Sequence, residues 1–180
     1  MLLSEMNPMA PFVHRRRIRF GETDAAKIVY TVRFFDYAID SIDAWYEEIV
    51  GVSLYALNMH HGVSCPFVHA ELDFVRALRP GDDVLTTVLV ERMGRSSLSF
   101  GIHGALADGQ PTCSGCFTVS FITPSTMKSI PIPIPIAERV RLYQARCAEF
   151  SAAAPSGDGA AVDHLVPAVD THRSSAEGNQ

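Results

Sequence analysis

The chain has 180 residues, of which 47% are hydrophobic and 19% are charged, and its formal net charge is −5. This composition fits one globular domain and excludes a disordered chain. The acidic charge argues against general binding to nucleic acid or to an anionic membrane, so we expect neither partner. No apolar run reaches the roughly 18–20 residues of a membrane span, and the first residues lack the pattern of a signal peptide. Four cysteines are too few for a disulfide framework, and we expect a cytoplasmic protein.

The sequence predicts three regions: a flexible N-terminus at residues 1–10, one folded domain at 11–150 and a disordered tail at 151–180. The tail is rich in Ala, Ser, Gly and Pro and has no aromatic residue, so it can bury little surface. Its two histidines, His164 and His172, are expected to be solvated. Two histidines on a flexible chain make a weak metal site.

The first periodic segment is a strand over residues 12–20, in which one face carries His14 and the opposite face carries Arg15, Arg17 and Arg19. An arginine face can resemble a nucleic-acid-binding stripe. Because the net charge is acidic, we expect this face to lie in water or to pair with acidic residues of a neighbouring strand.

A long helix and four further strands follow. Apolar residues repeat every three or four positions over residues 33–50, which predicts a helix capped by Thr31 and stopped at Gly51. Alternation predicts strands within residues 68–75, 83–93, 96–106 and 111–122. The expected apolar face of the first of these strands consists of Val68, Ala70, Leu72 and Phe74. A last helix is expected from about Ala137. The predicted fold class is α+β, with a curved, five-stranded antiparallel sheet wrapped around the long helix, plus a C-terminal helix.

The segment between the first strand and the helix reads FGETDAAKIVYTVRFFDY, from Phe20 to Tyr37. It resembles the active-site segment of the 4-hydroxybenzoyl-CoA thioesterase family. The positions that match the family's usual form are Phe20, Gly21, Glu22, Asp24, Ala26, Ile28, Val29 and Tyr30. Two later stretches, LRPGDDVLTTVLVERMGRSSLSF and PIPIPIAERV, also resemble that family. The resemblance covers roughly residues 12–148.

The resemblance implies a hotdog fold and hydrolysis of an acyl-CoA thioester. It implies no metal and no cofactor, because CoA is part of the substrate, and it implies self-association as a homodimer or homotetramer. One position departs from the family: Lys27 stands where glycine is usual. If that turn needs a positive φ, lysine is costly there, and the local backbone is expected to differ.

Asp24 is the candidate catalytic carboxylate. Hydrolysis of a thioester requires attack on the carbonyl carbon and stabilisation of the oxyanion that develops. Backbone N–H groups around Thr31, at the start of the helix, could polarise the thioester oxygen. Asp24 would attack directly or deprotonate a water, and the sequence leaves both roles open. Tyr30, the last residue of the motif, joins the candidate catalytic group. The alternative is that Asp24 only closes a turn. Glu22 is expected to contact the catalytic residues without touching the substrate, or to lie on the surface.

The phosphates of CoA need basic or hydroxyl partners. The turn predicted at residues 92–97 supplies both, and the candidate CoA-binding residues there are Arg92, Arg95, Ser96 and Ser97. The alternative is a solvated hairpin, with Arg76 and Arg79 as second candidates. His61, together with His60 in a loop after the helix, could line an acyl pocket, although most such histidines are solvated or structural.

Two further groups of residues have a structural and a functional interpretation. The aromatic residues Phe34, Phe35 and Tyr37 could surround an aromatic acyl group or simply belong to the core. Cys113 and Cys116 suggest zinc or redox chemistry, but residues three apart on a strand face opposite sides, so we expect both to pack.

The sequence therefore predicts an acyl-CoA thioesterase for an aromatic acyl group of the benzoyl or hydroxybenzoyl type. One alternative is a thioesterase for aliphatic acyl-CoA or an acyl carrier protein. The other is a non-catalytic protein that binds acyl-CoA.

Overall fold

A computed structural model describes residues 10–153 of the chain. The strands are β1 (Phe12–Arg17), β2 (Phe67–Phe74), β3 (Asp83–Met93), β4 (Ser97–Leu106), β5 (Pro111–Ser120), β6 (Ile122–Thr123) and β7 (Lys128–Ser129). The helices are α1 (Val32–Trp45), α2 (Leu54–His61) and α3 (Ile134–Ala153), with a short 3₁₀ turn η1 (Phe20–Glu22) and a π turn η2 (Tyr46–Val50). No helix within residues 10–153 is long and apolar enough to cross a membrane.

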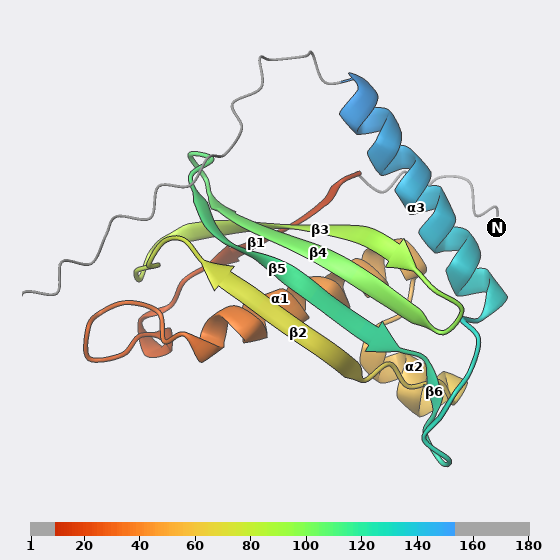
Figure 1. Cartoon of the computed structure of the whole chain (residues 1–180). Coiled ribbons are helices and arrows are strands. Elements are labelled where there is room, and N and C mark those ends of the chain that lie inside the picture. The colour runs from red at the N-terminus through yellow and green to blue at the C-terminus, as the bar shows by residue number, and fades with distance from the viewer. Residues whose placement is uncertain (1–9, 154–180) are drawn as a thin grey trace, which may run out of the picture.

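Five strands form one antiparallel sheet in the order β1-β3-β4-β5-β2, and the sheet curves around α1 (Figure 1). The predicted fold class is confirmed. The short strands β6 and β7 form a separate pair. The strand β1 pairs with the first half of β3, so the end of β1 and the start of β3 lie together at one end of the sheet.

The helix α1 lies against the inner face of the sheet because one side of it is strongly apolar. Ile42 and Trp45 are completely buried in the main core, together with Phe100 and Phe117 of the sheet. Trp45 packs edge-on against Phe100, with ring centroids 5.1 Å apart. The helix widens into the π turn η2 and stops at Gly51, whose φ of 85° is the left-handed conformation expected of such a stop. Thr31 holds the N-cap position, but its side chain accepts no hydrogen bond.

The arginine face of β1 is solvated and paired, as predicted. Arg15 lies 3.2 Å from the Asp83 carboxylate on the neighbouring strand, and Arg17 lies 4.0 Å from it. Both arginine side chains are more than two thirds exposed, so these ion pairs contribute little to stability. Arg16 lies on the opposite face of β1, toward α1.

The predicted apolar face of β2 is largely wrong. Of its four members only Leu72 is partly buried, and Val68 is 62% exposed. The reason is position: β2 is the last strand of the sheet and has a neighbour on one side only, and its register with β5 shifts between Phe67 and His69. The strand therefore has an open edge within the part of the chain that the structure describes.

The helix α3 begins at Ile134, three residues earlier than predicted, and covers the half of β3 that β1 does not reach. The Tyr143 hydroxyl donates to the Val88 carbonyl and accepts the Phe12 N–H at 3.0 Å. Gln144 Nε2 donates to the Val90 carbonyl at 3.0 Å. These bonds satisfy carbonyl groups that would otherwise form an open sheet edge. Most of the N-terminal and tail regions expected from the sequence, at 1–10 and 151–180, lies outside the described residues.

Candidate functional site

The segment before α1 folds into a small hairpin, residues 22–30, which we call the Asp24 hairpin. Its base is closed by the Tyr30 N–H, which donates to the Glu22 carbonyl at 3.1 Å. Thr23 and Val29 form an antiparallel bridge above it, and the Asp24 N–H donates to the Ile28 carbonyl at 3.0 Å. Asp24 therefore begins the tip of the hairpin, and its side chain is exposed.

One Asp24 carboxylate oxygen, Oδ1, accepts the Ala26 N–H at 2.8 Å. This bond closes the turn, as expected if Asp24 has a structural role. It leaves the second carboxylate oxygen of Asp24 without a hydrogen-bond partner among residues 10–153. Lys27 has φ 61°, so the turn keeps the left-handed conformation that a glycine would favour. The expectation that the backbone would differ because of Lys27 is wrong: the N–H of Lys27 still donates to the Asp24 carbonyl, at 3.0 Å.

The start of α1 offers unpaired backbone donors next to this hairpin. Within the described part of the chain, the N–H groups of Thr31 and Val32 have no acceptor, whereas those of Arg33 and Phe34 donate to carbonyls one turn back. Such groups carry the positive end of the helix dipole and can polarise a carbonyl oxygen. Tyr30 is 55% exposed, so its ring faces solvent beside these donors.

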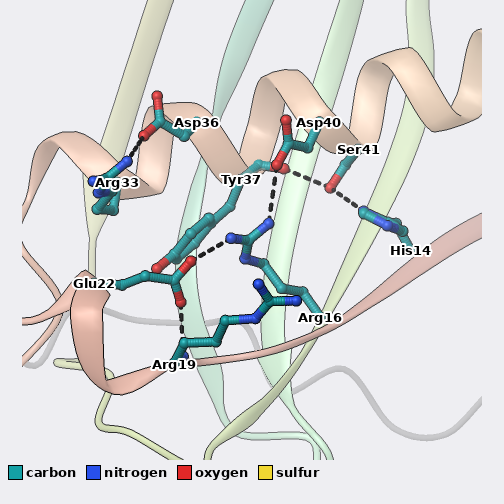
Figure 2. A network of polar contacts seen from close by, with 9 residues as sticks. All are labelled: His14, Arg16, Arg19, Glu22, Arg33, Asp36, Tyr37, Asp40 and Ser41. Atoms are coloured by element: carbon teal, nitrogen blue, oxygen red, sulfur yellow. Dashed lines mark hydrogen bonds and ion pairs between the residues drawn. The ribbon is translucent and has the colours of Figure 1, made fainter.

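A network of polar side chains joins β1, the Asp24 hairpin and α1 (Figure 2). Arg16 forms an ion pair with Glu22 through one guanidinium nitrogen and a 2.9 Å bond to Asp40 through another. Its guanidinium carbon lies 4.3 Å from the centre of the Tyr37 ring, a cation–π contact. The second Glu22 oxygen accepts the Arg19 N–H at 2.7 Å. We call Arg16, Glu22, Tyr37 and Asp40 the Arg16 network.

The network shifts the pKa of three of its members, and the shifts of Glu22 and Tyr37 bear on the chemistry of the site. Burial alone would raise the pKa of Glu22, but the Arg19 N–H and the Arg16 guanidinium outweigh it and hold that pKa below its usual range. Burial and the negative charge of Glu22 raise the pKa of Tyr37 to about 12. Glu22 is thus an ionised, fully engaged carboxylate, which makes it a poor general base.

His14 makes a second connection between β1 and α1. Its Nδ1 lies 3.0 Å from Ser41 Oγ, and Ser41 Oγ donates to the Tyr37 carbonyl at 2.6 Å. Because the serine proton is used in that bond, the network assigns a proton to Nδ1. Burial lowers the pKa of His14, with Arg16 acting in the same direction and Asp40 against it.

Within the chain, the structure does not bring the predicted CoA turn close to Asp24. Residues 92–97 lie at the end of β3 and the start of β4, whereas the Asp24 hairpin lies beside the start of β3, at the opposite end of the sheet (Figure 1). The eleven residues of β3 separate the two by about 35 Å, at ~3.3 Å per residue. The turn is held through its backbone: the Arg95 and Ser96 carbonyls accept the N–H groups of Ile132 and Phe121, both at 2.8 Å.

The remaining candidate binding residues lie at one end of the sheet or the other. Arg76 and Arg79 are exposed and flank Leu78, whose carbonyl accepts the Val29 N–H at 2.9 Å, so they lie beside the Asp24 hairpin. His60 and His61 are not in a loop as expected: they form the last turn of α2, where Gly62 ends the helix with φ 62°. They lie at the end of the sheet opposite to the Asp24 hairpin. This follows because Ser64, shortly after α2, bridges to Ile122, in the segment that contacts the 92–97 turn.

The two cysteines of the C-x-x-C sequence lie on opposite faces, as predicted. Cys113 is buried against α1, and Cys116 lies on the outer face near Glu91 and Thr118. Among residues 10–153 no group of three or more metal-ligating side chains is found.

The aromatic residues at the start of α1 belong mainly to the core. Phe34 and Tyr37 are each 5% exposed, and Phe34 packs edge-on against Phe74 at the end of β2, with centroids 5.1 Å apart. A cavity of about 10 Å³ lies between this part of α1 and the sheet, lined by Phe34, Tyr37 and apolar side chains of β3 and β4. That volume holds about one water molecule, so this cavity is too small for an aromatic acyl group.

Reasoning from the sequence missed the Arg16 network. Arg16 shares the inward side of this segment with His14 of β1 and with Ile18, the residue that follows β1. A charged residue at an inward-facing position needs an acidic partner, and that signal would have pointed to the acids of the hairpin and the helix.

Comparison with known proteins agrees with this architecture. The family model of the thioesterase-like superfamily matches residues 18–140. A 1,4-dihydroxy-2-naphthoyl-CoA hydrolase of Prochlorococcus marinus is 29% identical over 107 residues, which are 54% of this chain and 68% of that protein. For this and two other such hydrolases, the match spans 55–68% of the relative's length.

Solved structures give the same result. A thioesterase superfamily protein from Jannaschia is 32% identical with a TM-score of 0.70, and the match covers 75% of this chain and 94% of that one. A 1,4-dihydroxy-2-naphthoyl-CoA thioesterase from Synechocystis, at 21% identity, shares the fold with a TM-score of 0.68, over 72% of this chain and 95% of that one. The chain therefore belongs to the thioesterase-like superfamily: it is a thioester hydrolase with the hotdog fold that its sequence predicts.

Proposed function

We propose that this thioesterase hydrolyses an aromatic acyl-CoA to the free acid and CoA, with Asp24 as its catalytic carboxylate. The observation that carries the proposal is that one short segment presents two groups, a carboxylate and the unpaired N–H groups at the start of a helix. Asp24 begins the tip of an ordered hairpin with one carboxylate oxygen free, and that hairpin leads directly into unpaired N–H groups at the start of α1. A thioester placed between them has an attacking group on one side and an oxyanion partner on the other.

The reaction needs only these groups and water. Asp24 takes a proton from a water that adds to the carbonyl carbon, or it attacks that carbon itself and the resulting anhydride takes up water. In both cases the C–S bond breaks, the sulfur leaves as CoA thiolate and takes a proton, and the acyl group leaves as a carboxylate. The N–H groups of Thr31 and Val32 would stabilise the charge on the carbonyl oxygen.

Exposed apolar side chains around the hairpin favour an aromatic acyl group. Tyr30, Val32 and Phe74 are 46–55% exposed at this end of the molecule, where an aromatic ring could pack against them. The relatives from Prochlorococcus and Synechocystis are named for hydrolysis of a naphthoyl thioester, which is also aromatic.

We also propose that the protein acts as a homodimer, alone or within a homotetramer, formed by pairing two copies of β2. The strand β2 has an open edge and exposed Val68 and Phe74, and such an edge favours pairing with a second strand. In an antiparallel pair related by a two-fold axis, the far end of one protomer lies beside the Asp24 end of the other. The CoA-binding turn with Arg92, Arg95, Ser96 and Ser97, and His61 of α2, would then serve the partner's site.

The four cysteines are all free thiols. Free thiols are usual in a reducing compartment, and they support a cytoplasmic location.

The first experiment is a thiol-release assay with a panel of CoA esters. Benzoyl-, 4-hydroxybenzoyl- and 1,4-dihydroxy-2-naphthoyl-CoA should be hydrolysed faster than hexanoyl- or palmitoyl-CoA. A preference for the aliphatic esters would show that the substrate is an aliphatic acyl-CoA and that the proposed aromatic class is wrong. Binding of the esters without release of any thiol would show a non-catalytic acyl-CoA-binding protein.

The role of Asp24 is tested by Asp24→Asn in the same assay. Asparagine keeps the oxygen that accepts the Ala26 N–H, so the hairpin should remain folded. We expect kcat to fall by at least about 100-fold, the usual contribution of a positioned acid–base or nucleophilic group. Asp36→Asn is the matched control, because Asp36 is a half-exposed acid on the first turns of α1, paired with Arg33. Near-wild-type turnover of Asp24→Asn would leave Asp24 with a turn-closing role only.

A further inference from the structure

The two strands of the Asp24 hairpin are anchored by different means. The returning strand is fixed by its own backbone and by burial: Val29 is 4% exposed and its N–H donates to the Leu78 carbonyl. The chain that leads into the outgoing strand lacks such support. In the 3₁₀ turn η1, Phe20 is 83% exposed, and nothing lies within 4 Å of the place where a side chain of Gly21 would begin.

Glu22 is the point at which the outgoing strand is attached. Its side chain is 12% exposed, and its two carboxylate oxygens are held by Arg16 and by the Arg19 N–H. Its backbone carbonyl accepts the Tyr30 N–H that closes the hairpin. Within residues 10–153, the other bonds of this strand reach only along the hairpin or back to its own turn: the Thr23 hydroxyl, for example, donates to the Phe20 carbonyl at 2.8 Å.

Arg16 extends this attachment to the helix that carries the oxyanion donors. The same guanidinium that holds Glu22 bonds to Asp40 at 2.9 Å and stacks on Tyr37, both on α1 (Figure 2). The position of Asp24 relative to the start of α1 is therefore set through two charged contacts that share one rigid, planar group. A lysine in place of Arg16 could not make both contacts with fixed geometry.

We propose that Glu22 is a positioning residue: through Arg16 and the Arg19 N–H it fixes the outgoing strand of the hairpin and so aligns Asp24 with the start of α1. Glu22 does not touch the substrate in this scheme and takes no proton. The inference rests on the proposed role of Asp24 in hydrolysis and adds the residue that holds Asp24 in place. A displacement of a reacting group by about 1 Å can cost 100-fold in rate.

The test compares Glu22→Ala with Asp83→Ala. Both variants remove a carboxylate that pairs with a β1 arginine, but Asp83 has no side-chain contact with the hairpin. We expect Glu22→Ala to lower kcat at least about 10-fold and to change KM less than about 3-fold, because substrate binding uses other groups. Asp83→Ala should keep the kcat of the wild type. If Glu22→Ala keeps its kcat, or if the loss is entirely in KM, the proposal is wrong.

A second measurement reports the hairpin without any substrate. Amide hydrogen exchange of Asp24 and Lys27, whose N–H groups are bonded within the hairpin, should become at least about 10-fold faster in Glu22→Ala and stay unchanged in Asp83→Ala. If the wild type hydrolyses no ester, the proposed function fails, while the exchange rates still decide whether Glu22 orders the hairpin. Should Glu22→Ala fail to fold, Glu22→Gln keeps the side-chain volume but loses one of the two oxygen acceptors, and it must show the same two effects in weaker form. Unchanged exchange in both variants would overturn the proposal.

Discussion

Lys27 shows at the scale of one residue how the hairpin tolerates an unfavourable backbone. Its φ of 61° costs an L-residue roughly 1–2 kcal/mol. The conformation persists because the hairpin is bonded on both sides of the turn, at Asp24 and at Ile28. The family usually has glycine at this position, so the lysine is a feature of this chain.

Lys27→Gly should therefore stabilise the protein by about 0.5–1 kcal/mol. The strain that is relieved exceeds the entropy that glycine adds to the unfolded chain, about 0.4–1 kcal/mol. Urea denaturation checks this as a rise in midpoint at constant slope. Met127→Gly is the matched control, because Met127 has φ 54° in the turn between β6 and β7, far from Asp24. A lower midpoint for Lys27→Gly would mean that the lysine side chain stabilises the hairpin.

The residue scale also shows what a motif can and cannot predict. The motif identified Asp24 and its place between a strand and a helix, because both follow from the order of residue types along the chain. It did not identify Arg16 as the partner of Glu22, because that contact depends on how β1 lies against α1. In the sequence, only the position of Arg16 on the inward face of the strand indicated that it needs an acidic partner.

At the scale of elements, β1 and α1 are joined by polar bonds at two places, Arg16 and His14. The alternation of β1 and the apolar side of α1 predicted both elements from the sequence. The exposed face of β2 could not be predicted in the same way, because its composition resembles that of an inner strand. Its exposure follows from its place at the edge of the sheet.

The His14 contact should make stability depend on pH. The folded-state pKa of His14 is lowered, chiefly by burial, so its contribution is complete above its ordinary pKa of about 6.5 and is lost as pH falls through the lowered value. Arg16, Asp40 and Ser41 face the ring. His14→Asn keeps a donor near Ser41 and does not titrate. Urea midpoints measured from pH 7.5 to 5 should fall more steeply for the wild type than for His14→Asn, and parallel curves would contradict this assignment.

The turn between β3 and β4 is tested by Arg95→Ala. If this turn holds the CoA phosphates, the substitution weakens ground state and transition state equally, so KM rises and kcat stays nearly constant. The expected loss is about 1–3 kcal/mol, as for a hydrogen bond to a charged group, and it should shrink at high salt. A truncated thioester without the nucleotide should show no effect. If Arg95→Ala leaves KM unchanged while Arg79→Ala raises it, the nucleotide lies at the Asp24 end of the same protomer.

At the scale of the whole molecule, Arg95 and Asp24 are separated by the length of β3. The proposed site, which uses both residues, would therefore need two copies of the chain. The sequence predicted both groups of residues but not their distance, because distance along the sheet depends on strand order and direction. Self-association was predicted from family resemblance alone, and the open edge of β2 gives it a physical reason.

Mixing of variants tests the shared site. Asp24→Asn and Arg95→Ala protomers, unfolded and refolded together, should form mixed dimers in which one of two sites is intact. Random pairing makes half of the dimers mixed, so we expect about a quarter of the wild-type activity at low substrate concentration. Each variant alone is the control. Activity no higher than the average of the two controls would place Arg95 and Asp24 in separate sites or within one protomer.

The bonds of Tyr143 also bear on how the chain folds as it is synthesised. Tyr143 joins Phe12, 131 positions earlier, to Val88, 55 positions earlier. A chain that leaves the ribosome from its N-terminus can therefore build most of the sheet long before the residue that closes it exists. Until then, the second half of β3 has free carbonyl groups at an open edge, which is a template for pairing with other chains. Contacts of such long range also slow folding. We therefore expect the nascent protein to be most prone to aggregation before α3 has been synthesised.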